Sequence, residues 1–227
     1  MQQLPLMLEH RRLLGREDFL VSAANVEAVE WIDAYPDWAQ VMAVVVVGAE
    51  GAGKTHISWL FSEKTEAKVY DVSELADELF SDVVPMNSAL VIDNVDKAIG
   101  DMGLEENLFH IVNYAFECNT KLFLTSSRAF AELDFTLPDL KTRLVSFPVA
   151  NLYEPDDEFL KALLVKQFLE RDLIVAPDVI EYIVKHIPRD TRSVKEVVEQ
   201  ADILSFEEKH RVTIPFIKKV IEKLAQS

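Results

Sequence analysis

The stretch GAEGAGKT, residues 48–55, decides the fold of this chain. Its three glycines free the backbone to curl so that successive amide hydrogens can face an anion. Lys54 is placed to reach the β- and γ-phosphates of a nucleotide, and the hydroxyl of Thr55 to bind Mg²⁺. The candidate nucleotide-binding residues of this phosphate loop are Gly48, Gly51, Ala52, Gly53, Lys54, Thr55 and the following His56.

The residues on either side of the loop support this interpretation. An apolar run at 41–47, with four consecutive valines, leads into the loop and predicts a buried strand. Apolar residues at helical spacing follow the loop. A glycine-rich turn between a strand and a helix, with no ligand, is the alternative that this complete motif and its context disfavour.

Short apolar runs alternate with helix-like segments over the first 150 residues. The predicted strands are at 41–47, 68–70, 89–92, 121–124 and 145–149. The predicted helices between them are at 55–62, 72–80 and 104–118. This alternation predicts an α/β fold, a mostly parallel sheet flanked by helices on both faces.

A second unit, helical throughout, is expected from residue 151 onward. No valine-rich run follows, and the apolar spacing predicts helices at 156–171, 177–186, 191–207 and 213–224. The expected organisation is therefore an N-terminal peptide at 1–10, a nucleotide-binding core at 11–150 and a small helical domain at 151–227.

Two polar positions follow the apolar run at 89–92. Asp93 ends the predicted strand, where a carboxylate can hold the water shell of Mg²⁺. By itself it is as compatible with a strand-end turn, and the phosphate loop makes the metal site the favoured interpretation. Asn94 stands where many ATPases carry a carboxylate that activates the attacking water, and an amide cannot accept a proton. Asp96 is the substitute candidate, with helix capping as its alternative, so slow hydrolysis is expected.

Composition narrows the class of partner and compartment. The 23 Lys plus Arg against 39 Asp plus Glu give a formal charge of −16, which repels polyanions and disfavours a broad duplex-binding surface. Cys118 is the single cysteine, so the sequence has no internal disulfide. Because neither a signal peptide nor an apolar run of about 20 residues is found, a cytoplasmic protein without a membrane anchor is expected.

With these features the chain resembles the AAA+ superfamily and, within it, the DnaA-related branch that includes Hda-type regulators. The resemblance spans nearly the whole chain. Three further segments contribute to it, KLFLTSSR at 121–128, LPDLKTRL at 137–144 and RDTRSV at 189–194. They resemble the sensor 1 strand, the arginine-finger box and the sensor 2 helix of that family.

The resemblance implies roles for these segments. Thr125 or Ser126 would lie near the γ-phosphate, Arg143 would be an arginine finger that acts across a subunit boundary, and Arg192 would be the sensor 2 residue. Arg189 lies close enough to Arg192 to compete for that last role.

The resemblance also implies an adenine-binding segment, and the finger assignment of Arg143 has an alternative. Phe19, Leu20 and Val21 stand where the family holds the adenine ring. Arg143 has an alternative as a surface residue paired with Asp139 one helical turn earlier, an interaction worth at most a few tenths of a kcal/mol.

The first residues are similar to the short peptide by which Hda-type proteins bind the sliding clamp of the replicative polymerase. Two leucines could fill an apolar groove while a glutamine hydrogen-bonds at its edge and a proline lowers the ordering cost. The partner-binding candidates are Gln2, Gln3, Leu4, Pro5 and Leu6.

The leading hypothesis is a negative regulator of replication initiation that binds ADP or ATP with Mg²⁺, binds the clamp and stimulates hydrolysis of ATP bound to a DnaA-type initiator. A DNA-binding domain after residue 227 and the extra helices of initiators between Lys54 and Asp93 are not expected, so direct origin binding is disfavoured. The alternatives are a stand-alone ATPase or loader acting in its own homo-oligomer, and a nucleotide-locked adaptor without a catalytic role.

Overall fold

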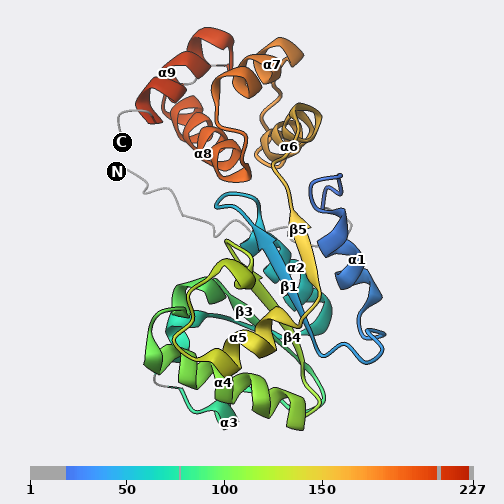
Figure 1. Cartoon of the computed structure of the whole chain (residues 1–227). Helices are drawn as coiled ribbons and strands as arrows, with labels where there is room; N and C mark the ends of the chain where they lie inside the picture. Colours follow the sequence, from blue (N-terminus) through green and yellow to red (C-terminus); the bar gives the residue numbers. More distant parts are fainter. Residues whose placement is uncertain (1–18, 77, 209–210, 225–227) are drawn as a thin grey trace, which may run out of the picture.

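A five-stranded parallel sheet forms the centre of the larger of two units in the computed structural model, which describes residues 19–76, 78–208 and 211–224 (Figure 1). Its strand order is β2-β3-β4-β1-β5, and every pairing is parallel. The strands are β1 Ala43–Gly48, β2 Lys68–Asp71, β3 Ala89–Asp93, β4 Lys121–Ser126 and β5 Val149–Leu152. The predicted α/β class is confirmed.

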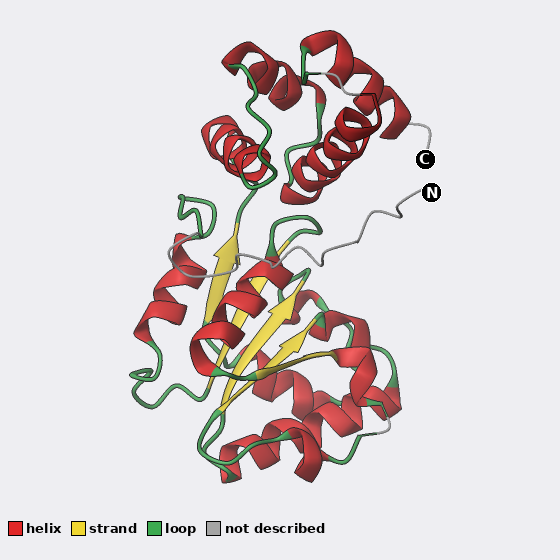
Figure 2. Cartoon of the chain, turned by 180° about the vertical axis from the view of Figure 1, so that it is seen from behind, coloured by secondary structure: helices red, strands yellow, loops and turns green. Residues whose placement is uncertain are grey.

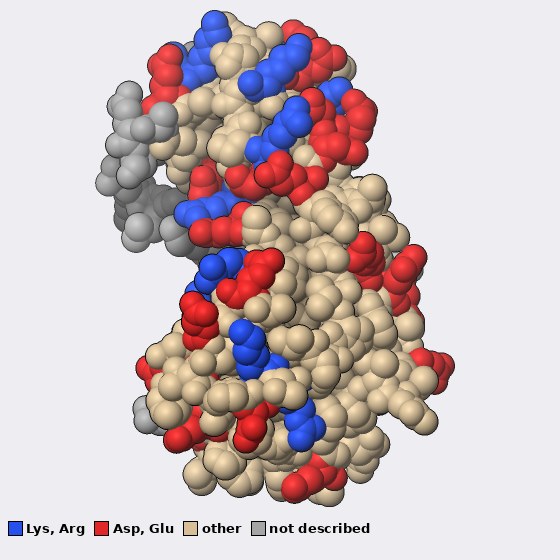
Figure 3. Space-filling model, in the orientation of Figure 1, with Lys and Arg blue, Asp and Glu red and all other residues tan. Residues whose placement is uncertain are grey.

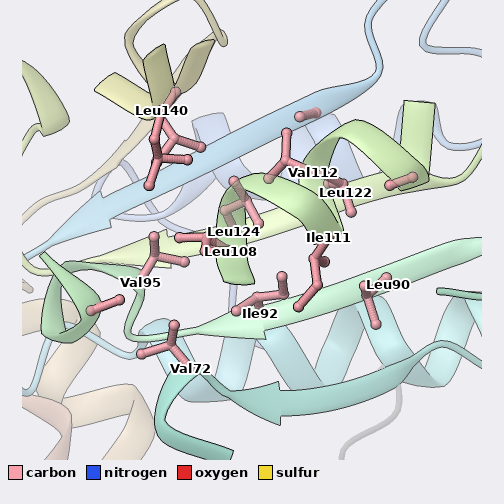
Figure 4. Close-up of a cluster of buried hydrophobic side chains, with 14 of the residues drawn as sticks. Val72, Leu90, Ile92, Val95, Leu108, Ile111, Val112, Leu122, Leu124 and Leu140 are labelled. Carbon is pink, nitrogen blue, oxygen red and sulfur yellow. The ribbon is translucent and has the colours of Figure 1, made fainter. Parts of the chain in front are cut away.

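Helices cover both faces of this sheet (Figure 2). The valines of β1 alternate between the faces, because successive side chains of a strand point in opposite directions. Val44 and Val46 pack with α1 (Val26–Ala34) and α2 (Lys54–Thr65). Val45 packs in the cluster of α4 (Met102–Glu117) and α5 (Pro138–Val145). Figure 4 shows side chains of α4 and α5 against those of β3 and β4 in this second cluster.

The helical unit has its own apolar core. Its four helices are α6 Asp157–Leu169, α7 Pro177–His186, α8 Thr191–Glu208 and α9 Ile214–Leu224, which lie close to the predicted positions. Fully buried members of its core include Leu160, Leu164, Ile183, Val198 and Ile217. The unit therefore packs around a centre separate from the sheet.

Two predictions about local structure are wrong. Residues 145–149 do not form a strand, because α5 continues to Val145 and β5 begins at Val149 and runs through Asn151 and Leu152. The expected helix at 72–80 is two short elements, the 3₁₀ turn Val72–Leu75 and α3 (Phe80–Val83). In the turn, the Asp71 side chain accepts from the Ser73 amide in a capping box, which favours a tight turn at the end of β2.

Two further 3₁₀ turns, Val95–Ala98 and Phe130–Glu132, follow β3 and β4. None of the described helices is long and apolar enough to cross a membrane.

Helix α1 is tied to edge strand β5 by the Glu27 carboxylate. It accepts hydrogen bonds from the backbone N–H of Asn151 at 2.8 Å and from the Tyr153 hydroxyl at 3.2 Å. The bond from the Asn151 backbone is the main cause that lowers the pKa of Glu27, and it outweighs the opposing effect of burial. The ionised carboxylate thus holds α1 on the sheet.

Glu27→Gln should lower the free energy of unfolding at pH 7, because the amide offers one acceptor oxygen instead of two. The folded-state pKa lies below the ordinary value of 4.5, so the contribution is present above that pH and is lost as the pH falls through the folded-state pKa. Urea unfolding at pH 7 and about pH 3.5 should show a smaller difference from the unmodified protein at the lower pH. An equal difference at both pH values contradicts the assignment. Glu181→Gln, in an exposed pair with Lys185 on α7, is the control.

Candidate nucleotide-binding site

The predicted phosphate loop joins the carboxyl end of β1 to the first turn of α2. Gly51 and Gly53 adopt φ values of +80° and +100°, a left-handed conformation that favours glycine. A Cβ atom on Gly48 would lie 2.8 Å from the Cβ of Leu152. The backbone therefore requires glycine at these three positions, and the α2 N-terminus at Lys54 faces the same edge as the loop.

The Lys54 side chain lies against this loop. It is 8% exposed, and its Nζ donates to the carbonyl oxygens of Gly48 at 2.8 Å and Ala49 at 3.0 Å. Burial lowers the pKa of Lys54, and the negative charges of Asp96 and Asp93 oppose that effect. A compact cation is thus placed between the loop and the carboxylates that follow β3.

The Asp93 carboxylate joins three elements. Its Oδ2 accepts from the Thr55 hydroxyl of α2 at 2.9 Å, and its Oδ1 from Ser58 of the same helix at 3.3 Å. The Thr125 hydroxyl of β4 makes a further short hydrogen bond to Oδ1. Hydroxyl and carboxylate oxygens suit Mg²⁺, so these groups fit the ion, and Thr55 and Asp93 would hold it and its water shell.

Asn94, the next residue, adopts a left-handed backbone conformation with φ of 58°. Its backbone N–H donates to the Thr125 hydroxyl at 2.9 Å, and its side-chain Nδ2 to Oδ2 of Asp71 at 2.7 Å. Strands β2, β3 and β4 therefore meet at this residue.

The candidate residues at the ends of β3 and β4 make different contacts. Thr125 contacts Asp93, whereas the Ser126 hydroxyl donates to the Arg128 carbonyl at 2.5 Å. Asp96 caps no helix through its side chain; it accepts from the backbone N–H of Ser127 at 3.0 Å and from the Ser127 hydroxyl. The capping alternative for Asp96 is therefore wrong.

The candidate adenine segment lies beside the start of α2. The Phe19 ring contacts the His56 ring edge-on, with 5.1 Å between centroids. Asn25 holds the segment, because its Nδ2 donates to the Leu20 carbonyl at 2.9 Å. Val21 is 46% exposed. An apolar and aromatic surface thus adjoins the phosphate loop.

The helical unit contacts the loop through the first turn of α8. The Thr191 amide and hydroxyl both donate to the Gly51 carbonyl, at 3.1 and 2.8 Å. Arg192 pairs with Glu50 of the loop at 3.3 Å. Arg189 instead pairs with Asp157 of α6 at 3.0 Å, so Arg192 is the arginine beside the loop. Between α8 and the loop is a pocket of about 370 Å³ lined by Glu50, Gly51, Asp190, Arg192, Ser193 and Glu196.

Arg143 lies away from this region. Helix α5 ends at Val145, just before β5 begins, so Arg143 is near the amino edge of the parallel sheet, whereas the phosphate loop is at the carboxyl edge. Its guanidinium lies over the Phe116 ring, 4.8 Å from the centroid. Among the described residues no ion pair joins Arg143 to Asp139, so the predicted alternative is wrong.

Three residues that make polar contacts in the site were not predicted from the sequence. Ser58 is one helical turn after Thr55 and could have been found from that spacing. Ser127 is the first residue after β4, and strand-end position was its only signal. Asp71 gave no signal, because its proximity to Asn94 depends on β2 and β3 being neighbours. The peptide Gln2–Leu6 lies outside the described residues.

Comparisons with known proteins agree with this geometry. A family model described as "Hda, lid domain" matches residues 156–221. The chromosomal replication initiator protein DnaA of Flavobacterium psychrophilum is 25% identical over 203 residues, which cover 81% of this chain and 42% of that protein. The chain thus spans less than half the length of that relative.

Solved structures share the fold. Domain III of the Thermotoga maritima replication initiation protein DnaA has a TM-score of 0.78 at 18% identity, covering 92% of this chain and 96% of that one. AMPPCP-bound DnaA from Aquifex aeolicus has a TM-score of 0.72 at 19% identity, covering 84% and 65%.

The phosphate loop, the Asp-ended neighbouring strand and the four-helix unit thus give this chain the fold of domain III of DnaA, a parallel sheet flanked by helices and followed by a helical lid. Residues 156–221 match the lid domain of Hda, and 203 residues of the chain are similar to a DnaA initiator.

Lys54→Ala should lower the affinity for ADP by at least about 100-fold, since a cation that reaches the phosphates is replaced by a methyl group. Titration with a fluorescent ADP analogue measures this. Lys161→Ala removes a lysine from an exposed lid pair and should bind as the unmodified protein does. Equal affinity of both variants would mean that the nucleotide does not occupy this loop.

Proposed function

We propose that this chain is a negative regulator of chromosomal replication initiation that stimulates hydrolysis of ATP bound to a DnaA-type initiator. It binds adenine nucleotide and Mg²⁺ itself, and it binds the sliding clamp through its first residues. The observation that carries the proposal is the position of Arg143 at the sheet edge opposite the phosphate loop.

The nucleotide part of the proposal rests on the loop and its surroundings. Lys54 and the backbone amides of the loop bind the phosphates, and Thr55 and Asp93 would hold Mg²⁺. Phe19–Val21 contact the base. The other nucleotide-binding residues are Gly48, Gly51, Ala52, Gly53 and His56. AMPPCP bound to the Aquifex aeolicus DnaA supports an adenine nucleotide. ADP and ATP present the same β-phosphate to such a loop.

An arginine at the opposite edge cannot serve the phosphates of its own loop, so a finger role for Arg143 requires a second subunit. Its planar cation would stabilise the charge that develops on a transferring phosphoryl group. The packing of Arg143 on Phe116 holds the guanidinium in place, and such contacts contribute roughly 0.5–1 kcal/mol at exposed sites.

The chain's own site is less suited to fast hydrolysis. Asn94 occupies the water-activating position, and its amide cannot accept a proton. Asp96, the substitute candidate, is engaged by Ser127. An arginine finger combined with a slow hydrolytic site favours action on the ATP of a partner. The competing function is a stand-alone ATPase motor that acts in its own homo-oligomer.

Surface charge favours a protein partner over duplex DNA. The formal charge is −16, and on the face shown in Figure 3 the basic side chains lie scattered among acidic ones. Duplex DNA is bound mainly through its phosphates, so an acidic surface of this kind disfavours it.

The contact of Thr191 and Arg192 with the loop favours a second candidate function. A nucleotide bound between α8 and the loop would fix the orientation of lid and core, which makes the chain a nucleotide-locked adaptor. Such an adaptor has no catalytic use for Arg143.

Arg143→Ala should abolish stimulation of DnaA-ATP hydrolysis while nucleotide and clamp binding persist. Fingers supplied by a partner contribute about 10³ to 10⁵ to the rate, so stimulation should fall to the background of DnaA alone. The assay follows phosphate release from DnaA-ATP with DNA-loaded clamp. Arg211→Ala, an exposed lid arginine, is the matched control, and unchanged stimulation by Arg143→Ala favours the adaptor.

The double substitution Leu4→Ala and Leu6→Ala should abolish clamp binding, because it removes both apolar side chains expected to fill the groove. Deletion of residues 1–8 should have the same effect. Surface plasmon resonance on immobilised clamp measures binding, and Ile174→Ala, which truncates a 90% exposed apolar side chain of the lid, is the control. Clamp binding that survives both changes rules out this peptide.

A further inference from the structure

The ends of β2 and β3 place an acid beside an amide. Asp71 and Asp93 are register partners, so the residue after Asp93 lies next to the end of β2. There the Asn94 Nδ2 donates to Oδ2 of Asp71 at 2.7 Å. Position 94 thus carries an amide, and the nearest strand end, that of β2, carries a carboxylate.

Asp71 fixes which way the Asn94 amide points. An ionised carboxylate can only accept hydrogen bonds, so the group facing it must be the amide NH₂. The amide is planar, and its oxygen therefore points away from β2. Strand β4 and, beyond it, β1 with the phosphate loop lie on that other side.

The Asp71 carboxylate is itself fully engaged. Its Oδ1 accepts from the Ser73 amide at 3.0 Å and the Ser73 hydroxyl at 2.5 Å, while Lys97 lies 3.6 Å from Oδ2. Burial raises the pKa of Asp71, but these hydrogen bonds, that of Asn94 and the charge of Lys97 outweigh it and lower the pKa overall. Asp71 is thus ionised at neutral pH and has no position left for a reacting water.

We propose that Asp71 is a positioning residue, which holds the Asn94 amide oxygen toward the nucleotide site, and that exchanging acid and amide between these strand ends converts the chain into a faster ATPase. The inference rests on the nucleotide-binding part of the proposed function and is independent of the clamp and of DnaA. It assigns the slow hydrolysis expected of this chain to the position of the carboxylate on β2, one strand away from Asn94.

The reaction affected by the exchange is the hydrolysis of ATP. The oxygen of water forms a bond to the γ-phosphorus of ATP, and the bond from that phosphorus to the β–γ bridging oxygen breaks, so that ADP leaves with the electron pair. The Asn94 oxygen can orient this water but cannot take its proton. The carboxylate introduced by Asn94→Asp takes it, and Asp71→Asn supplies the NH₂ group that holds the new carboxylate in place.

The test compares the unmodified protein with Asp71→Asn, Asn94→Asp and the double exchange. Single-turnover hydrolysis of ATP by excess protein should be about 10²-fold faster for the double exchange, the lower end of what a positioned base contributes. Asn94→Asp alone should gain less in rate, because the new carboxylate would lie beside that of Asp71. Repulsion between the two favours protonation of one of them, and a protonated carboxyl group cannot take a proton from water. Asp71→Asn alone should be slower than the unmodified protein, since the Asn94 amide then turns its NH₂ toward the water.

Two further measurements separate the possible failures. Urea unfolding of the nucleotide-free proteins should show that each single substitution lowers the midpoint and that the double exchange restores it; additive losses would overturn the positioning role. Restored stability and ATP affinity without a rate gain would leave Asp71 only a structural role and also overturn the proposal. Asp101→Asn, at the α4 N-cap where both residues cap well, is the matched control.

A fluorescent ADP titration of the same four proteins distinguishes this inference from the proposed function. Absence of binding by the unmodified protein refutes nucleotide binding, while the unfolding comparison still decides whether Asp71 holds Asn94.

Discussion

The geometry of the site depends on the Asp93 carboxylate. This side chain is 5% exposed and bonds to Thr55 and Ser58 of α2 and to Thr125 of β4. A buried polar group left without a partner costs about 1–3 kcal/mol, and more if it is charged. The register between β3, β4 and the phosphate-loop helix is therefore fixed by the same group that would hold the metal ion. The proposed metal-binding role and the packing of these elements therefore depend on one residue.

That coupling extends to the next residue along the chain. The Thr125 hydroxyl accepts from the backbone N–H of Asn94 and donates to Asp93, which holds Asn94 in its left-handed conformation. Asparagine tolerates this conformation better than most residues. The side chain is then directed between β2 and the site, where Asp71 engages its nitrogen. A side chain that cannot accept a proton thus directly follows the Asp93 carboxylate.

The lid depends on the loop in a similar way. Gly51 accepts two hydrogen bonds from Thr191, and a Cβ atom on Gly51 would lie 2.8 Å from the Cβ of Asp190. The absence of a side chain at Gly51 thus allows both the curl of the loop and the close approach of α8. The Arg192–Glu50 pair is a second contact between α8 and the loop in the same region.

The sequence by itself determined the elements whose signals are local. The valine run, the glycine spacing of the loop and the helical periodicity of the lid predicted β1, the turn into α2 and α6 to α9, because each depends on neighbouring residues. Only the tertiary structure showed the contacts of the candidate residues. Thr125 rather than Ser126 bonds to Asp93, Arg192 rather than Arg189 pairs with the loop, and Asp71 is the partner of Asn94. The reason is that these contacts depend on the strand order β2-β3-β4-β1-β5 and on lid docking, which join residues far apart in the chain.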